Sequence, residues 1–259
     1  DGWKIILRNQ FHDIIPGSSI REVYEDSREE YAEAWEIGSR AWDQAGQLVA
    51  GKSVPHARTV WNSAPWPTKG VLTIPADDSL QQGCWKAADG TTLQAELQHG
   101  QWIVQVPQVP ALGYTTITFD SAVAPAPADS PFKVESKHVT TPFYELEWND
   151  HGQLTRLYDR TADREVLAPG ARGNVLQLFE DKPLNFDAWD IDIYYQEKMK
   201  EVQELSTSEV VETGLLRTVI RFEWKVGEST IRQQMILYGD DRRIDFVTEA
   251  DWHERQQLL

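Results

Sequence analysis

The chain has 259 residues, of which 41% are hydrophobic and 25% charged, a composition typical of ordered globular proteins and not of disordered ones. Its 41 acidic residues outnumber the 25 basic ones and give a net charge of −16, which disfavours binding to nucleic acid or anionic lipid. No apolar run approaches the ~20 residues that cross a bilayer, so we expect no membrane partner. The single cysteine, Cys84, excludes an intramolecular disulfide and fits a reducing compartment.

Two helical segments open the chain. Residues 3–11 have the pattern of the last turns of a helix, and Pro16-Gly17 then predicts a turn. Ser19 and Glu22 have the spacing of a capping box that opens a second, longer helix. In this second helix, apolar or small residues recur at steps of three and four, while acidic residues occupy the opposite face. The apolar face comprises Ile20, Val23, Tyr24, Ser27, Tyr31, Ala34, Trp35, Gly38, Ala41, Trp42, Ala45, Leu48 and Val49.

So long an amphipathic helix requires partner helices, and the chain offers only the short segment before Pro16. We therefore expect part of the apolar face to be exposed in this chain. Such a surface could also mediate a homodimer.

The hydrophobic period changes from 3.6 to 2 after Gly51, which predicts short antiparallel strands and a small β-sandwich. Residues 122–131 form a Pro/Ala linker, after which longer strands predict a second, larger sheet system. No βαβ alternation is present, which argues against a Rossmann or TIM-type sheet. The predicted strands are 58–62, 70–74, 93–97, 102–106, 114–119, 144–148, 154–158, 175–179, 215–224, 230–238 and 243–250.

The predicted fold class is therefore α+β and mainly β. A helical segment at residues 1–52 is followed by a small antiparallel β-sandwich at 53–123 and a larger β-sandwich at 124–259.

Common catalytic motifs, including the P-loop, G-x-G-x-x-G, G-x-S-x-G and H-E-x-x-H, are absent from the sequence. His12 and Asp13 are adjacent at the predicted bend between the two helices, where an imidazole beside a carboxylate suits a ligand or catalytic position. The alternative is a structural histidine at a helix end, with Asp13 paired to a cation. One His and one Asp do not complete a zinc shell, so any further ligands must come from another part of the polypeptide.

The acidic segment 179–195 holds five acids and several aromatic residues between two predicted strands. It could contact sugar hydroxyls through Asp187 and Asp190, with Trp189 stacking on a pyranose face. The alternatives are a calcium loop, although the spacing differs from an EF-hand, and an interface loop anchored by Trp189. Residues 252–254 (Trp-His-Glu) also resemble a site, but we interpret them as the polar end of a strand.

Several motifs, in the same order along nearly the whole chain, resemble glycoside hydrolase family 38 α-mannosidases. The sequence at 10–20 resembles the segment that opens the long bundle helix of that family, and the sequence at 60–67 resembles the first strand of its small β domain. Later motifs of the family are matched at 174–183, 186–191 and 251–254.

The resemblance implies that His12 is one ligand of a catalytic zinc and that Asp13 binds mannose hydroxyls beside it. It places Asp187, Trp189 and Asp190 at the substrate, and it requires His12 and Asp13 to lie at the surface of this chain. In the secreted and Golgi-type branch the residue before the ligand is commonly His, whereas here it is Phe11. This departure implies the cytosolic and bacterial branch and a cytoplasmic location.

Family members cleave terminal α-mannosides with retention of configuration, which requires a nucleophilic carboxylate and an acid/base carboxyl roughly 5 Å apart. The resemblance places both groups, and the other zinc ligands, in an N-terminal α/β domain upstream of this chain. The chain is thus expected to be the end of a three-helix bundle with the following β domains, and to be inactive alone. The alternatives from other classes are a metal-free carbohydrate-binding β-sandwich and a scaffold domain.

Overall fold

The computed structural model describes residues 1–50, 54–123, 128–186 and 189–259, and its fold is α+β and mainly β, as predicted. The chain divides into two compact units. The first contains residues 1–54, 179–199 and 256–258, and the second contains residues 55–178 and 200–255. The predicted boundary at 52 and 53, and residues 124–127 of the predicted linker, lie outside the described residues.

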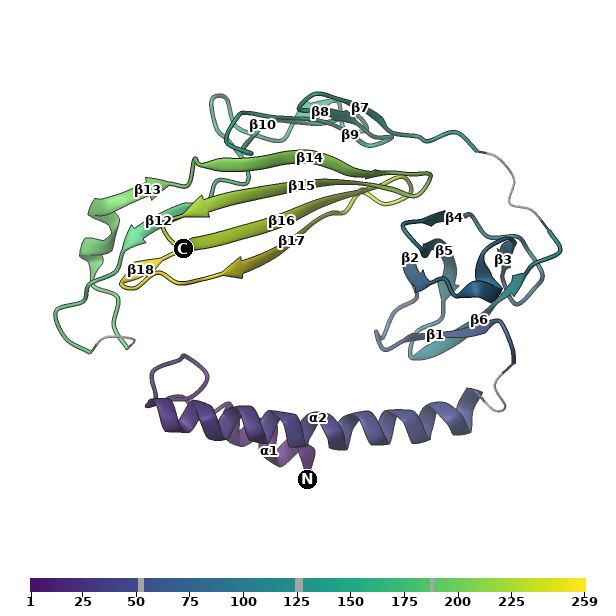
Figure 1. The fold of residues 1–259 in the computed structure, drawn as a ribbon, viewed down its shortest axis with the longest axis horizontal. Coiled ribbons are helices and arrows are strands. Elements are labelled where there is room, and N and C mark those ends of the chain that lie inside the picture. Colours follow the sequence, from purple (N-terminus) through teal and green to yellow (C-terminus); the bar gives the residue numbers. More distant parts are fainter. Residues whose placement is uncertain (51–53, 124–127, 187–188) are drawn as a thin grey trace. The chain divides into compact units, whose positions relative to one another are not determined.

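The first unit begins with α1 (Gly2–Asn9) and α2 (Arg21–Ala50), which lie side by side (Figure 1). The buried Asn9 side chain links them, because its amide donates to the Ile5 carbonyl at 3.0 Å and to Glu30 Oε2 at 2.6 Å. Arg8 Nε donates to the same Glu30 oxygen at 3.1 Å. The contact between the helices therefore depends on one polar cluster together with a few apolar side chains such as Ile5 and Ala34.

The other residues of the first unit belong to a small sheet and to the loop that it carries. In this sheet β12 (Gln177–Glu180) pairs antiparallel with β18 (Gln257–Leu258) and has β13 (Met199–Glu201) on its other side. The chain between β12 and β13 is a long loop, residues 181–198, that ends in the 3₁₀ helix η2 (Ile193–Lys198).

The second unit contains the predicted small β-sandwich. One sheet has the order β1 (Ala57–Asn62), β6 (Gly113–Asp120), β3 (Cys84–Lys86), and the other has the order β2 (Thr68–Pro75), β5 (Gln101–Val109), β4 (Ala95–Gln98). The short helix η1 (Asp78–Leu80) joins β2 to the segment before β3. Trp85 and Trp102 each pack edge-on against Phe119, with ring centroids 5.3 and 5.4 Å apart, and these rings form the centre of the core.

The larger β-sandwich lies in the same unit and has two layers (Figure 1). One is five-stranded, with the order β11 (Arg164–Glu165), β10 (Leu154–Asp159), β9 (Tyr144–Trp148), β8 (His138–Thr140), β7 (Lys133–Glu135). The other is four-stranded, with the order β14 (Leu205–Thr213), β15 (Arg217–Val226), β16 (Ser229–Tyr238), β17 (Ile244–Asp251). Alternating residues of both layers point inward. In the core the Phe222 ring stacks on Trp224 and packs edge to face against Trp148.

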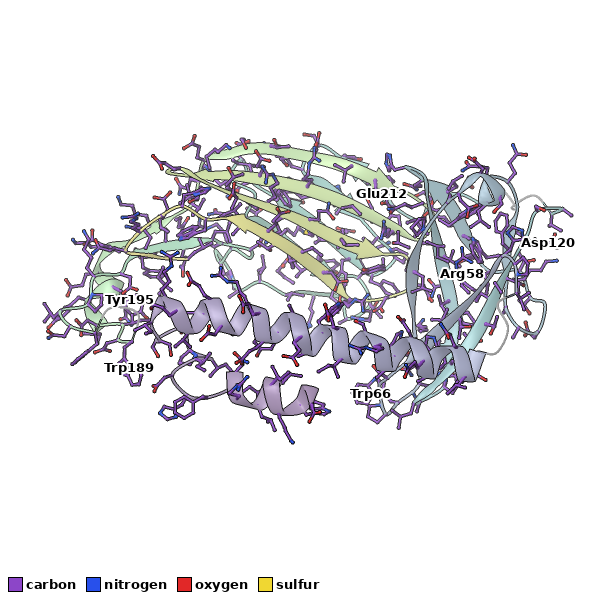
Figure 2. The ribbon with its side chains drawn as sticks, turned by 60° about the horizontal axis from the view of Figure 1, so that its bottom comes forward. Arg58, Trp66, Asp120, Trp189, Tyr195 and Glu212 are labelled. Carbon is purple, nitrogen blue, oxygen red and sulfur yellow. The ribbon has the colours of Figure 1, made fainter. Side chains whose placement is uncertain are left out.

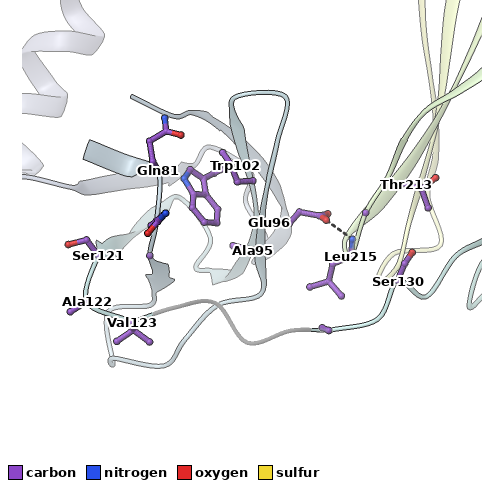
Figure 3. Close-up of a pocket in the computed structure, with 15 residues that line it drawn as sticks. Gln81, Ala95, Glu96, Trp102, Ser121, Ala122, Val123, Ser130, Thr213 and Leu215 are labelled. Atoms are coloured by element: carbon purple, nitrogen blue, oxygen red, sulfur yellow. Dashed lines mark hydrogen bonds between the residues drawn. The ribbon is translucent and has the colours of Figure 1, made fainter. Parts of the chain in front are cut away.

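A carboxylate joins the two sandwiches within the second unit (Figure 3). Glu96 on β4 accepts hydrogen bonds from the backbone amides of Leu215 at 2.7 Å and Leu216 at 3.0 Å, in the turn between β14 and β15. Gln98 Nε2 donates to the same carboxylate at 2.8 Å. Gly214 makes this approach feasible, because a Cβ atom there would overlap the Glu96 carboxylate and the Gln98 amide.

Candidate functional site

The bend between α1 and α2 is held from inside by backbone carbonyls and one tyrosine. The Asp13 carbonyl accepts a hydrogen bond from the Ser19 hydroxyl at 2.6 Å, and Ser18 Oγ lies 3.4 Å away. Tyr24, on the first turn of α2, accepts from the Ser19 amide at 2.9 Å, and its hydroxyl lies 3.3 Å from the Ile14 carbonyl. The Ser19 hydroxyl thus bonds to a carbonyl of the bend. Helix α2 begins at Arg21, one residue later than the predicted capping box requires.

The bend directs the His12 and Asp13 side chains outward. They are 74% and 42% exposed, and His12 Nε2 lies 3.7 Å from Asp13 Oδ1. The imidazole packs against the Phe11 ring, with centroids 4.2 Å apart. The expectation that both side chains lie at the surface of this chain is therefore confirmed.

The donors at this bend fit part of a zinc shell. Among the described residues, no three His, Cys, Asp or Glu side chains are grouped so that they could hold a metal ion. The exposed imidazole and the adjacent carboxylate amount to at most two ligands, whereas zinc takes three or four from protein. The described residues of the bend therefore offer no more than part of a zinc shell.

The second predicted group lies on the 181–198 loop. Trp189 is 61% exposed and Asp190 is exposed, while Asp187 lies outside the described residues. The amides of Trp189 and Asp190 both donate to the Phe186 carbonyl, at 2.8 and 2.9 Å. The Leu184 amide donates to Asp192 Oδ2 at 2.7 Å. The Trp189 indole and the Asp190 carboxylate face solvent.

The base of this loop is held by charge and by ring packing. Glu180 accepts from Lys198 Nζ at 2.7 Å and lies 3.3 Å from Lys182 Nζ, and these two cations lower the pKa of the Glu180 carboxyl. The Phe179 and Tyr195 rings pack edge to face at 5.2 Å. Trp189 and Tyr195 belong to the same loop, and the contacts of Glu180 and Phe179 hold the two ends of that loop together (Figure 2).

Asp181 was not singled out from the sequence, although it lies in a matched motif. Its Oδ1 atom is buried and has no hydrogen-bond partner in the part of the chain that the structure describes. A buried carboxylate oxygen without a partner is costly, so Asp181 is an additional candidate for a contact with a group outside these residues. Its sequence signals were its place in the matched motif at 174–183 and in the acidic segment 179–195.

Both predicted groups belong to the first unit. Within the described ranges, no hydrogen bond or ion pair joins the His12–Asp13 pair to Trp189 or Asp190. The Trp-His-Glu run is structural, as interpreted from the sequence: Glu254 Oε1 accepts from the Glu228 amide at 2.8 Å and from Ser229 Oγ at 2.9 Å. It therefore braces the turn between β15 and β16.

Two large hollows occur away from these residues. A groove of about 600 Å³ follows α1 and α2 and is lined by Ile6, Tyr31, Ala34, Trp35, Gly38 and neighbouring residues. A cleft of about 750 Å³ adjoins Glu96 and the β14–β15 turn (Figure 3). Of the predicted site residues that the structure describes, none lines either one. The groove agrees with the predicted exposed apolar face of α2.

Two family models match separate parts of the chain. Residues 1–49 match the model of the alpha-mannosidase middle domain, and residues 139–259 match the model of the C-terminal domain of glycosyl hydrolases family 38. The chain belongs to glycoside hydrolase family 38. The resemblance inferred from the motifs is thus confirmed, and the His12–Asp13 bend lies inside the middle-domain match.

Curated relatives named as α-mannosidases match nearly the whole chain, and two solved structures share its fold. The chain is 29% identical to Alpha-mannosidase 2C1 of Mus musculus over 99% of its own length, and 24% identical to Alpha-mannosidase G of Dictyostelium discoideum. It spans about a quarter of the length of these curated relatives (24% and 27%). An alpha-mannosidase structure from Enterococcus faecalis V583 has the same fold with a TM-score of 0.72, at 10% identity, over 99% of this chain and 37% of that one.

A second Enterococcus faecalis structure, described as a protein in glycosyl hydrolase family 38, matches with a TM-score of 0.71 at 11% identity, over 99% of this chain and 39% of that one. No helix in the described ranges is both long enough and apolar enough to pass through a bilayer.

Proposed function

We propose that this chain is the middle and C-terminal part of a zinc-dependent retaining α-mannosidase that hydrolyses terminal α-mannosides. The observation that carries the proposal is the exposed His12–Asp13 pair on a hydrogen-bonded bend, inside a middle-domain match. The relatives are named as α-mannosidases.

In this proposal His12 is one zinc ligand and Asp13 orients mannose hydroxyls beside it. The ion, when bound, would coordinate sugar hydroxyls and neutralise negative charge near the nucleophile. Asp13 is an acceptor-only group when ionised, so its exposed carboxylate suits a pair of hydroxyl donors. The braced bend keeps this carboxylate beside the imidazole without burying either group.

The 181–198 loop would contribute the second part of the substrate site. Asp190, and with it Asp187, would accept hydrogen bonds from sugar hydroxyls, and the Trp189 indole would pack on a pyranose face. We assign no nucleophile or acid/base residue to this chain, since retention needs two carboxyls about 5 Å apart at the scissile bond. An upstream α/β domain would supply both groups and the other zinc ligands, so the chain alone would be inactive. The Phe11 signature favours the cytosolic and bacterial branch and hence a cytoplasmic protein.

The test uses the full-length enzyme that contains this chain, with His12→Asn and, as a matched control, His99→Asn. His99 lies in the tight turn between β4 and β5 with φ +49°, a conformation that asparagine adopts readily. Loss of a zinc ligand should lower zinc content and reduce hydrolysis of an aryl α-mannoside by about 100-fold or more. The control variant should keep both.

Wild-type zinc content and turnover in His12→Asn would overturn the proposed role of His12. A second measurement concerns the 259-residue chain alone, which should hydrolyse the same substrate no faster than buffer does. Mannose binding by this chain after chelation of all metal would favour the alternative, a metal-free carbohydrate-binding module.

A further inference from the structure

The loop that carries Trp189 and Asp190 belongs to a longer segment, residues 173–200, whose two flanking residues bind each other. Arg172 precedes the segment and Glu201 follows it. Arg172 Nη1 donates to Glu201 Oε2 and Nη2 donates to Glu201 Oε1, both at 2.7 Å. Such a two-pronged guanidinium–carboxylate pair fixes orientation as well as distance. The pair therefore fixes the separation of the two ends of the segment.

A buried glutamine completes this contact. Gln153 is 1% exposed, and its Nε2 donates to Glu201 Oε2 at 3.0 Å. Its Oε1 accepts from Arg172 Nη1 at 2.6 Å and from Asn149 Nδ2 at 3.0 Å. Both ends of the Gln153 amide are thus satisfied by the pair and by the turn between β9 and β10. A polar cluster built on a buried amide, with both ends of that amide bonded, holds a single geometry well.

That turn is itself anchored to the core of the large β-sandwich. The Trp224 indole donates to the His151 carbonyl at 2.8 Å. Gly152 has φ +75°, and a Cβ atom there would lie 2.6 Å from the Trp224 ring, so glycine lets the turn lie directly on the indole. The turn is therefore a rigid support for Gln153.

Backbone bonds brace the same two chain ends. Leu154 and Gly173 exchange two hydrogen bonds of 2.9 Å, and the Val202 amide donates to the Leu176 carbonyl at 2.9 Å. The Arg172–Glu201 pair and these bonds tie the start and the end of the segment to one another and to β10. The segment between them carries the exposed turn with Trp189 and Asp190.

We propose that Arg172, Glu201 and Gln153 form a clamp that sets the geometry of the 181–198 loop, and that they act as positioning residues for Trp189 and Asp190 in substrate binding. The clamp itself depends only on the structure of the loop, whereas its role in substrate binding rests on the proposed function. Each of the two therefore has its own measurement.

The loop is tested in the 259-residue chain by hydrogen exchange of backbone amides. Arg172→Met removes both charged bonds and keeps much of the aliphatic stem. Amides of the 181–198 loop should exchange about 10-fold faster, while those of β15 and β16 keep their rates. Glu223→Gln is the matched control, because Glu223 accepts from Arg232 Nε at 3.0 Å on those two strands. This control should leave the loop unchanged.

A variant that exchanges the two charges distinguishes loss of the clamp from loss of folding. In the double variant Arg172→Glu/Glu201→Arg the pair is reversed, and a 180° rotation of the Gln153 amide presents the opposite groups to the pair at the cost of the bond from Asn149. Protection of the loop should be restored, at least in part, relative to either single variant. Wild-type exchange of the loop in Arg172→Met, or equal loosening of the whole chain in all variants, would overturn the clamp.

The positioning role is tested in the full-length enzyme. Arg172→Met should raise KM for an oligomannoside several-fold and change kcat by less than about 2-fold, because the clamp touches no reacting atom. Arg172→Lys, which keeps the charge but loses the fork, should give an intermediate KM. A loosened loop together with a wild-type KM would overturn the positioning role and leave the clamp intact. Loss of activity in His12→Asn with an unaffected KM in Arg172→Met would show that this inference fails while the proposed zinc role stands.

Discussion

The two compact units differ most clearly in how they treat large apolar side chains. In the second unit, Trp85 and Trp224 are no more than 1% exposed and lie at the centres of two separate cores. In the first unit, Trp35 is 77% exposed and Leu48 86% exposed, on the apolar face of α2. Similar residue types, placed at equally regular spacing, thus reach opposite environments.

The difference shows where each unit obtains its stability. Each β-sandwich buries the inward faces of two sheets against each other, so its sequence supplies both halves of the core. The helical segment supplies one apolar face and only a short second helix to cover it, held by the cluster of Arg8, Asn9 and Glu30. The β part is therefore expected to dominate the free energy of unfolding of this chain.

Two tryptophan substitutions give the sharpest test of that expectation. Trp224→Ala should lower the free energy of unfolding by about 3–5 kcal/mol, because it leaves a cavity beside Phe222 and frees the His151 carbonyl. Trp35→Ala should change it by less than about 0.5 kcal/mol. Urea denaturation followed by circular dichroism measures both. Comparable losses in the two variants would mean that the helical face is covered in solution, for example in the predicted homodimer. Sedimentation would detect the dissociation of that dimer.

Replacing a glycine by alanine should change stability in opposite directions in the two units. Gly214→Ala forces the Glu96 carboxylate away from the Leu215 and Leu216 amides, and should cost about 1–3 kcal/mol. Gly38→Ala on α2 meets no atom within 4 Å and should gain about 0.5–1 kcal/mol from reduced backbone entropy.

Thermal unfolding by calorimetry should show one shared transition for the two β-sandwiches in the wild type and two transitions in Gly214→Ala. A wild-type melting curve for Gly214→Ala would mean that the Glu96 contact does not couple the two sandwiches.

The comparison also explains which parts of the fold could be predicted from the sequence. The strand at 144–148 was predicted with the bounds that β9 has, because its residues alternate regularly between buried and half-exposed environments. The strand β14 was missed entirely. It lies at the edge of its sheet, and its run of Ser, Thr and Glu side chains is largely exposed, so hydropathy gave no signal. The short strands β3, β7 and β8 were missed because three residues carry no measurable period.

The candidate site was predictable in its residue types but not in its supports. His12, Asp13, Trp189 and Asp190 were found from motifs, and the structure places all four at the surface. The clamp was invisible, because Gln153 and Glu201 are 48 residues apart and each resembles an ordinary polar residue. Such contacts are fixed by tertiary structure alone, since no local pattern in the sequence marks a buried glutamine as bonded.

A smaller effect is expected at the bend of the first unit. Tyr24→Phe removes the hydroxyl that accepts from the Ser19 amide and lies near the Ile14 carbonyl, which should cost about 0.5–1.5 kcal/mol locally. In the full-length enzyme this variant should weaken zinc binding without abolishing it, measured by competition with a chelator. Tyr31→Phe is the control, because the Tyr31 side chain is exposed on the groove. Equal zinc affinity in both variants would mean that the bend is held by other contacts.

The smallest effect is a pH dependence within the β part. The bonds from Arg172 and then from Gln153 lower the pKa of Glu201 to about 2, from an ordinary value of 4.5. Because the folded state keeps this carboxylate ionised where the unfolded state binds a proton, its contribution to stability is complete above pH 4.5 and is lost as the pH falls toward 2. The difference in stability between wild type and Glu201→Gln should therefore shrink over that window, measured by urea denaturation at several pH values.

Glu223→Gln serves again as the control for the loss of one carboxylate from the same unit. The effect at Glu201 should stay small, because the Arg172 side chain is 39% exposed and solvent screens the pair. A difference for Glu201→Gln that stays constant from pH 6 to pH 2 would indicate that the clamp does not lower the pKa of Glu201. The clamp would then be held by its hydrogen bonds to Gln153 and not by the charge of Glu201.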